Sequence, residues 1–186
     1  MKILLHACCG PCSIYPVEYL QEKGMEIQGY YYNPNIHPYT EFVKRRDTLL
    51  EYAASMGIPI ICEEDYLLEE FIRKVVHRES ERCRECYAMR LEETARAAQK
   101  GGFDSFTTTL LVSPYQKHEL IREIGVEYGQ KYGVPFYYAD FRPGYRKATA
   151  RSRELGMYRQ QYCGCIYSEK ERYFRQPKKE GAKTLK

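Results

Sequence analysis

The sequence predicts an α/β protein in which helices cover both faces of a parallel β-sheet. Short apolar segments alternate with longer amphipathic segments along the chain, and the connections between them are short. This alternation is typical of parallel sheets, because two parallel strands need a crossover connection between them, usually a helix. A length of 186 residues is enough for one domain with a substantial core.

Five short segments are expected to form the strands of this sheet. They are apolar and rich in β-branched or aromatic residues, as buried strands usually are. The first, KILLHA, begins one residue after the start of the sequence. In chain order the expected strands cover residues 2–7, 26–32, 58–62, 103–111 and 134–140.

The longer segments between these strands fit amphipathic helices. Ser13 can cap the first helix and Gly24 can end it, while the second helix places Phe42 and Leu49 on one side. The last helix has a proline near its start and a glycine at its end. The expected helices cover residues 13–24, 39–57, 65–77, 83–102 and 113–133.

The charge of the chain is unevenly distributed and indicates a polyanionic partner. Residues 142–186 contain 13 Lys and Arg against 4 Glu, although the whole chain carries a net charge of only +4. We expect Arg142, Arg146 and Lys147 to contact the phosphates of a nucleic acid. We divide the chain into one α/β catalytic domain at 1–168 and a basic, solvated tail at 169–186.

The start of the sequence indicates a protein of the cytoplasm. The apolar stretch before His6 is only four residues long, which is too short for the core of a signal peptide. The chain contains no apolar run near the roughly 18 residues that a membrane helix requires. In a reducing compartment, eight cysteines indicate metal binding or redox chemistry rather than a disulfide scaffold.

Seven of the eight cysteines fall into three clusters. These are Cys8-Cys9-x-x-Cys12, Cys83-x-x-Cys86 and Cys163-x-Cys165. The first cluster follows an expected strand, and ligands bind outside the carboxyl ends of the strands in a parallel sheet. Two C-x-x-C pairs can hold one zinc ion, but this many thiols favours an iron–sulfur cluster. Cys12 can be a ligand or can pack beneath a helix, and Cys62, outside the clusters, is expected to be a core thiol.

The pair at Cys163 and Cys165 has two open interpretations. Gly164 between them makes the backbone flexible enough for a strained, easily reduced disulfide, which can pass two electrons to a cluster or a substrate. Alternatively, one or both thiols ligate a metal ion. In either case we assign both cysteines to the catalytic chemistry.

Three further side chains near the expected strand ends are candidates for the site. Asp140 is followed by basic residues, so it is either a structural ion-pair partner or a group that binds a metal ion or moves protons. His37 lies in the loop NPNIHP and is expected to be exposed and to contact the substrate. Tyr115 can stack on a nucleobase.

Five separate motifs give the chain its resemblance to a known family. HACCGPCS, YYYNPNIHPYTEFVKRRDTL, CRECYAMRLEETA, TTTLLVSPYQ and DFR followed by RSRELGMYRQQYCGC occur in order from residue 6 to about residue 168. Together they resemble the epoxyqueuosine reductase family, in its cobalamin-independent class. The fold that this resemblance implies is similar to the adenine-nucleotide alpha-hydrolase-like sheet of the PP-loop tRNA-modifying enzymes.

The resemblance also implies an activity and a cofactor. It implies an oxidoreductase that converts epoxyqueuosine to queuosine at the wobble position of tRNA, removing the epoxide oxygen with two electrons. It further implies a [4Fe-4S] cluster held by Cys8, Cys9, Cys83 and Cys86, with Cys163 and Cys165 as a redox-active pair. In a rival allocation, three of the cysteines hold the cluster, and two others join Asp140 around an adjacent single iron.

The sequence also leaves two alternative functions open and predicts that the protein lacks one activity of its PP-loop relatives. The same cysteines are compatible with a zinc-stabilised tRNA-binding module without redox activity, or with a general thiol–disulfide oxidoreductase. The position of the phosphate loop in PP-loop relatives is occupied here by CCGPCS, so we expect no ATP hydrolysis. The electron donor is not indicated by the sequence.

Overall fold

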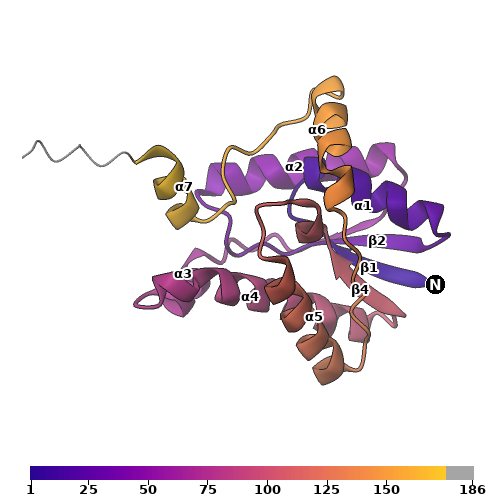
Figure 1. Ribbon diagram of the computed structural model, residues 1–186, viewed down its shortest axis with the longest axis horizontal. Helices are drawn as coiled ribbons and strands as arrows, with labels where there is room; N and C mark the ends of the chain where they lie inside the picture. Colours follow the sequence, from indigo (N-terminus) through magenta and orange to yellow (C-terminus); the bar gives the residue numbers. More distant parts are fainter. Residues whose placement is uncertain (175–186) are drawn as a thin grey trace, which may run out of the picture.

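The computed structural model describes residues 1–174, and a parallel sheet forms its centre (Figure 1). Within this part of the chain the sheet has four strands in the order β3-β2-β1-β4. Their bounds are β1 Lys2–His6, β2 Glu26–Tyr31, β3 Ile60–Cys62 and β4 Ser105–Thr108. All three strand pairings are parallel, so the predicted α/β class is confirmed.

The central strand β1 pairs with a neighbour on each side. Ile3 lies opposite Ile27 of β2 and Ser105 of β4. Ile3, Leu4 and Leu5 are buried one after another, since both faces of the sheet are covered. A continuous apolar run is what a strand covered on both faces requires.

Helices cover the two faces of the sheet as separate layers. One layer contains α1 (Gly10–Glu22), α2 (Tyr39–Ser55) and α6 (Tyr145–Glu154), and the other contains α4 (Arg82–Lys100) and α5 (His118–Tyr132) (Figure 1). Helix α3 (Leu68–Val75) packs beside α4. The last helix of the described chain is α7 (Ile166–Tyr173), and short 3-10 turns cover Glu79–Glu81, Thr109–Val112 and Arg142–Gly144.

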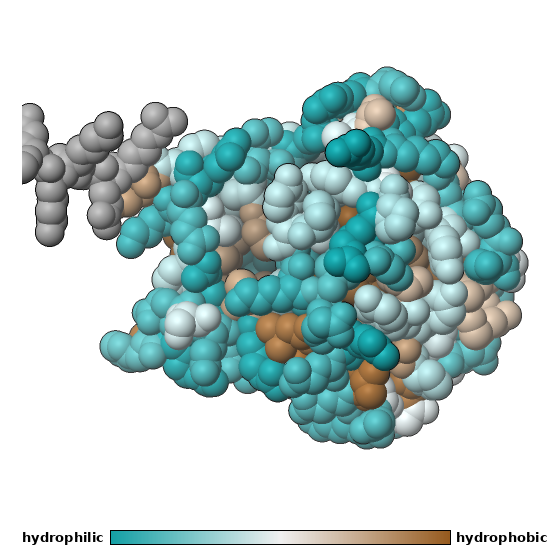
Figure 2. Space-filling view, in the orientation of Figure 1, coloured by the Kyte–Doolittle hydropathy of each residue, from teal (hydrophilic) through white to brown (hydrophobic). Residues whose placement is uncertain are grey.

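Each layer encloses its own apolar core against the sheet. Leu4 packs with Leu91 and Phe106 on the side of α4 and α5, whereas Ile3 packs with Ile14 on the side of α1. The visible surface is mostly hydrophilic, and its hydrophobic residues form small groups (Figure 2). None of the described helices is long and apolar enough to cross a membrane.

The predicted fifth strand at 134–140 is not a strand in the structure. It makes a single bridge between Phe106 and Phe136, in which Phe106 N donates to the carbonyl of Pro135 at 3.1 Å and Tyr137 N donates to that of Phe106 at 2.8 Å. Pro135 lacks the N–H that a longer ladder needs. The segment therefore follows the edge of β4 for one residue and then leaves it.

One of the two helices near the C-terminus was not anticipated. Helix α6 forms within the basic segment that was expected only to contact phosphates. Helix α7 runs across the predicted domain boundary at residue 168, so the first residues of the expected tail, 169–173, are helical. The rest of that tail, from residue 175 to residue 186, lies outside the described residues.

We predict that Gly10→Ala destabilises the protein. A Cβ at this position would lie 2.7 Å from Met157 Cε and 2.9 Å from the Thr48 carbonyl oxygen. Met157 can move aside, but the backbone of α2 cannot do so without repacking, and overpacking of this kind costs about 1–3 kcal/mol. Urea unfolding followed by circular dichroism measures the change, and an unaltered free energy of unfolding would contradict this account of the α1–α2 contact.

Candidate metal centre

Three cysteines converge where β1 ends and α1 begins. The Sγ atoms of Cys8, Cys9 and Cys12 all lie within 4.8 Å of one another. Cys9 has extended backbone and occupies the N-cap position of α1, so the chain turns between the first two thiols and the third. Cys8 and Cys9 are buried and Cys12 is half-buried. This arrangement presents three soft donors to one centre, which suits zinc or an iron–sulfur cluster.

Polar side chains from other elements support this triad. The Thr109 hydroxyl accepts from Cys8 N at 3.1 Å and donates to Cys8 Sγ at 3.4 Å. Gln160 Nε2 donates to Cys12 Sγ at 3.2 Å. Hydrogen bonds with Cys12 and Cys9 lower the pKa of Cys8. The hydrogen bond with Cys8 raises the pKa of Cys12, and burial raises the pKa of Cys9. Among the three thiols, Cys8 is therefore the one that ionises most readily.

The other clustered cysteines form a second group. Cys86 on α4 and Cys165 pack in one buried cluster with Phe71. Burial raises the pKa of Cys86 to about 12; Arg90 opposes this shift, and the nearby thiols of Cys163, Cys165 and Cys83 add to it. The two C-terminal cysteines thus lie beside the C-x-x-C pair of α4, although they are about 80 positions away in the sequence.

A buried arginine of α2 holds the C-terminal cysteines in place. Arg45 donates from Nη1 to the carbonyl of Cys163 at 2.9 Å and from Nη2 to that of Tyr162 at 3.0 Å. Its Nε pairs with Glu41 at 2.7 Å. Gly164 has φ 142°, a conformation that side-chain-bearing residues rarely adopt, so glycine permits the turn between the two thiols. All eight cysteines are free thiols, so the disulfide considered for Cys163 and Cys165 is not present.

The expectation that His37 is exposed is wrong. Its exposed fraction is 2%, because its ring packs against Phe71 with centroids 5.1 Å apart. The backbone N of His37 donates to the carbonyl of Gly164 at 2.9 Å, and Ile166 N donates to its Nδ1 at 3.4 Å. Its carbonyl accepts a hydrogen bond from the Tyr162 hydroxyl. His37 therefore anchors the segment that carries Cys163 and Cys165.

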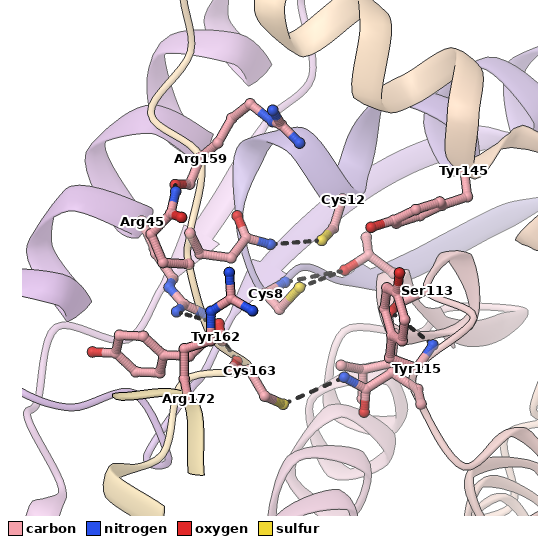
Figure 3. Close-up of a pocket in the computed structure, with 15 residues that line it drawn as sticks. Cys8, Cys12, Arg45, Ser113, Tyr115, Tyr145, Arg159, Tyr162, Cys163 and Arg172 are labelled. Carbon is pink, nitrogen blue, oxygen red and sulfur yellow. Dashed lines mark hydrogen bonds between the residues drawn. The ribbon is translucent and has the colours of Figure 1, made fainter. Parts of the chain in front are cut away.

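A pocket of about 520 Å³ opens onto both groups of thiols. Arg45, Arg159, Tyr162 and Arg172 lie on one side of it and Ser113, Tyr115 and Tyr145 on the other, with cysteine side chains between them (Figure 3). Gln116 Nε2 donates to the Sγ of Cys163 at 3.3 Å. The complete lining is Cys8, Cys12, Arg45, Thr109, Leu110, Ser113, Tyr115, Gln116, Tyr145, Arg159, Gln160, Gln161, Tyr162, Cys163 and Arg172.

The structure places Tyr115 at the pocket and the other predicted contacts outside its lining. Tyr115 is 82% exposed, and its ring lies edge-on to that of Tyr145, with centroids 6.1 Å apart. Lys147 pairs with Glu18 at 2.7 Å, and Arg146 is exposed on α6. The roles of these residues in substrate binding remain predictions.

Asp140 is held by an ion pair on the surface. Arg142 donates from Nε to Oδ1 at 2.8 Å and from Nη2 to Oδ2 at 2.7 Å. These hydrogen bonds lower the pKa of Asp140 to about 2. The carboxylate thus makes the salt bridge that the structural alternative describes, and its role in metal binding or proton transfer stays a prediction.

Sequence reasoning missed two buried arginines and the polar residues of the pocket. Arg45 lies three residues after Phe42 and four before Leu49, on the apolar side of α2. Arg90 lies at a similar buried position on α4. A basic residue at an apolar position of a helix is the signal that would have found both. Arg159 belongs to the basic part of the chain that was expected to contact phosphates, whereas no pattern indicated Gln160, which lies in an irregular segment.

The sequence model of the family described as "Epoxyqueuosine reductase QueH" matches residues 3–171. The chain belongs to the epoxyqueuosine reductase QueH family. It is 41% identical over 172 residues to a member from Dehalococcoides mccartyi, covering 92% of this chain and 94% of that protein. It is 37% identical over 180 residues to a member from Thermotoga maritima, covering 91% of each. Family membership confirms the predicted oxidoreductase of queuosine tRNA modification and does not favour the zinc-stabilised module.

Solved structures of low sequence identity share the fold. The U34-tRNA thiolase NcsA from Methanococcus maripaludis, described with its [4Fe-4S] cluster, superimposes with a TM-score of 0.61 at 16% identity, covering 90% of this chain and 61% of that one. A predicted subunit of a tRNA methyltransferase from Methanocaldococcus jannaschii gives 0.54 at 12% identity, covering 83% and 75%. The expected fold, a parallel sheet with helices on both faces, is thus shared with these structures.

We predict that Arg45→Gln both destabilises the protein and releases the segment around Cys163. The substitution leaves the Glu41 carboxylate buried without its partner, which typically costs about 3–5 kcal/mol. Arg46→Gln is the matched control, because Arg46 pairs at the surface with Asp47 and such pairs contribute about 0–1 kcal/mol. Urea unfolding and limited proteolysis near residue 160 measure the two effects. Equal stability of the two variants would contradict the proposed clamp.

Proposed function

We propose that the clustered cysteines hold an iron–sulfur cluster with which this chain reduces epoxyqueuosine to queuosine in tRNA. The convergence of the Cys8, Cys9 and Cys12 thiols within 4.8 Å is the observation that carries the proposal. The NcsA structure adds support, since a protein of the same fold is described with a [4Fe-4S] cluster. We place the reaction in the cytoplasm.

The residues present fit such a group. The donors are sulfur atoms rather than carboxylates, which favours iron–sulfur clusters or zinc over hard cations. The buried guanidinium of Arg90 donates to the thiol of Cys86, where it offsets the negative charge that a thiolate-bound group brings. A buried anionic site requires this kind of compensation.

The geometry favours Cys12 as a ligand beside Cys8 and Cys9. The set inferred from the family resemblance, which combines Cys8 and Cys9 with Cys83 and Cys86, stays a prediction. The rival allocation, with Cys163, Cys165 and Asp140 around an adjacent single iron, requires the Asp140 carboxylate to leave Arg142. We favour a cluster on the triad, and we assign Cys83, Cys86, Cys163 and Cys165 to a second, neighbouring role as ligands or as a redox pair.

The reaction removes one oxygen atom from the substrate. Two electrons and two protons convert the epoxide to a carbon–carbon double bond and a water molecule. The metal group supplies electrons when it is bound. The chain must hold the epoxide near the thiols and exclude bulk water from them, and the pocket lined by Cys8, Cys12 and Cys163 is placed to do so.

The two sides of the pocket suit a nucleotide. Tyr115 and Tyr145 offer aromatic faces for a base, and Arg159 and Arg172 offer positive charge for the phosphates on either side of it (Figure 3). Arg146 on the neighbouring helix α6 can extend this contact along the tRNA. The sequence CCGPCS at the start of α1 carries thiols in place of a phosphate loop, so ATP hydrolysis is not expected, and an external electron donor of unspecified kind is required.

We predict that Cys12→Ser loses most of its iron, whereas Cys62→Ser keeps it. Cys62 lies on β3 and is absent from the pocket lining and the triad. Iron and sulfide per chain, measured after anaerobic reconstitution, test the ligand assignment. Mass spectrometry of tRNA nucleosides tests conversion of epoxyqueuosine. A colourless wild-type protein with one zinc per chain and no sulfide would contradict the proposal.

We predict that Tyr115→Leu weakens tRNA substrate binding about 10- to 100-fold, while Tyr115→Phe changes it little. Stacking of one base on an aromatic ring contributes about 1–3 kcal/mol. The ring is 82% exposed, so neither substitution should lower stability. Filter binding with tRNA that contains epoxyqueuosine measures the affinity. If the leucine variant binds as tightly as wild type, Tyr115 is not a stacking platform.

A further inference from the structure

One buried side chain at the metal centre carries a positive charge without a carboxylate to balance it. Arg90, on α4, is only 1% exposed. Its Nε donates to the carbonyl of Cys86 at 3.0 Å, and its Nη2 donates to the Sγ of Cys86 at 2.9 Å. Within residues 1–174, none of the ion pairs includes Arg90.

The other buried arginine of the site shows what is unusual here. Arg45 is equally buried, but its Nε pairs with the Glu41 carboxylate at 2.7 Å. A buried guanidinium without an anion is strongly unfavourable, because it has lost its hydration and gains no attraction in return. The Tyr87 ring lies 5.7 Å from Arg90 Cζ but carries no net charge, so the balancing negative charge comes from a group other than a carboxylate.

The Arg90 guanidinium contacts one cysteine thiol and interacts electrostatically with two others from distant segments. The thiols with the strongest electrostatic effect on it are those of Cys86 on α4, Cys163 near α7 and Cys8 after β1. Two of these, Cys8 and Cys163, line the pocket. Arg90 thus interacts electrostatically with one thiol of the triad and with two thiols of the second group.

We propose that Arg90 is a positioning residue that balances the negative charge of the thiolate-bound metal group and raises its reduction potential. This inference rests on the proposed function, since it requires that group. Hydrogen bonds to the sulfur ligands and nearby charge are the means by which a protein sets the potential of an iron–sulfur cluster. A fixed cation favours the reduced form, because reduction adds negative charge.

A purely structural role for Arg90 predicts a different behaviour. Its bond to the Cys86 carbonyl, one helical turn away, could simply stabilise α4. In that case its removal would weaken the protein equally with and without metal. If Arg90 instead balances the charge of the metal group, its positive charge destabilises the metal-free protein and stabilises only the metal-loaded one.

The test compares Arg90→Met with Arg90→Lys in the full chain. Each variant is purified anaerobically and studied both reconstituted with iron and sulfide and stripped by a chelator. The readouts are iron per chain, the melting temperature of both forms, and the midpoint potential from a dye-mediated titration followed by absorbance and EPR. The lysine variant is the control that keeps the charge.

We expect Arg90→Met to be at least as stable as wild type when stripped, and to show either a lower midpoint potential or reduced iron content when reconstituted. Arg90→Lys should stay closer to wild type in both. The inference is overturned if Arg90→Met takes up full iron with an unchanged potential, or if it loses stability equally in both forms, including failure to fold. Failure of the wild-type protein to take up iron would contradict the proposed function as well.

Discussion

The hydrogen bonds from Arg45 to the carbonyls of Tyr162 and Cys163 are the contacts on which the site depends. The sheet and its connections bring only the first group of cysteines to the end of β1. The C-terminal cysteines reach the same place because one buried guanidinium of α2 binds the backbone beside them, while His37 binds the next residue. Hydrogen bonds from Gln160 to Cys12 and from Gln116 to Cys163 add further attachments of the chain after α6.

Electrostatics then explains why two arginines are buried in one small site. The triad lies at the end of β1, where hydrogen bonds lower the pKa of Cys8, and a second group of cysteines lies beside Arg90. Arg45 is neutralised by Glu41 and serves mainly to bind backbone carbonyls. Arg90 has sulfur as its partner instead. The two residues are alike in burial and charge but differ in their partners. Arg45 therefore fixes the backbone of the C-terminal segment, whereas Arg90 interacts with the sulfur atoms of the metal centre.

The parallel fold was predictable because its signals are local. Alternating apolar strands and amphipathic helices fix the class, and the rule that ligands collect at strand ends located Cys8 and Cys9. Failures arose where tertiary contacts override local pattern. Residues 134–140 have strand composition, but Pro135 limits their pairing. His37 lies in a loop that looks exposed, yet Phe71 and the returning C-terminal segment cover it. The neighbours of Cys163 could not be read from spacing, since Arg45 is more than 100 positions away.

The central claim is that sulfur atoms from distant parts of the chain meet around iron at one end of the sheet. An anomalous-scattering map of crystals grown and kept without oxygen, recorded on both sides of the iron absorption edge, tests it directly. The account predicts iron peaks within bonding distance of Cys8, Cys9 and Cys12, with the Cys163 segment beside them. A map with no iron at that end of the sheet, or with a lone zinc ion there, would contradict it.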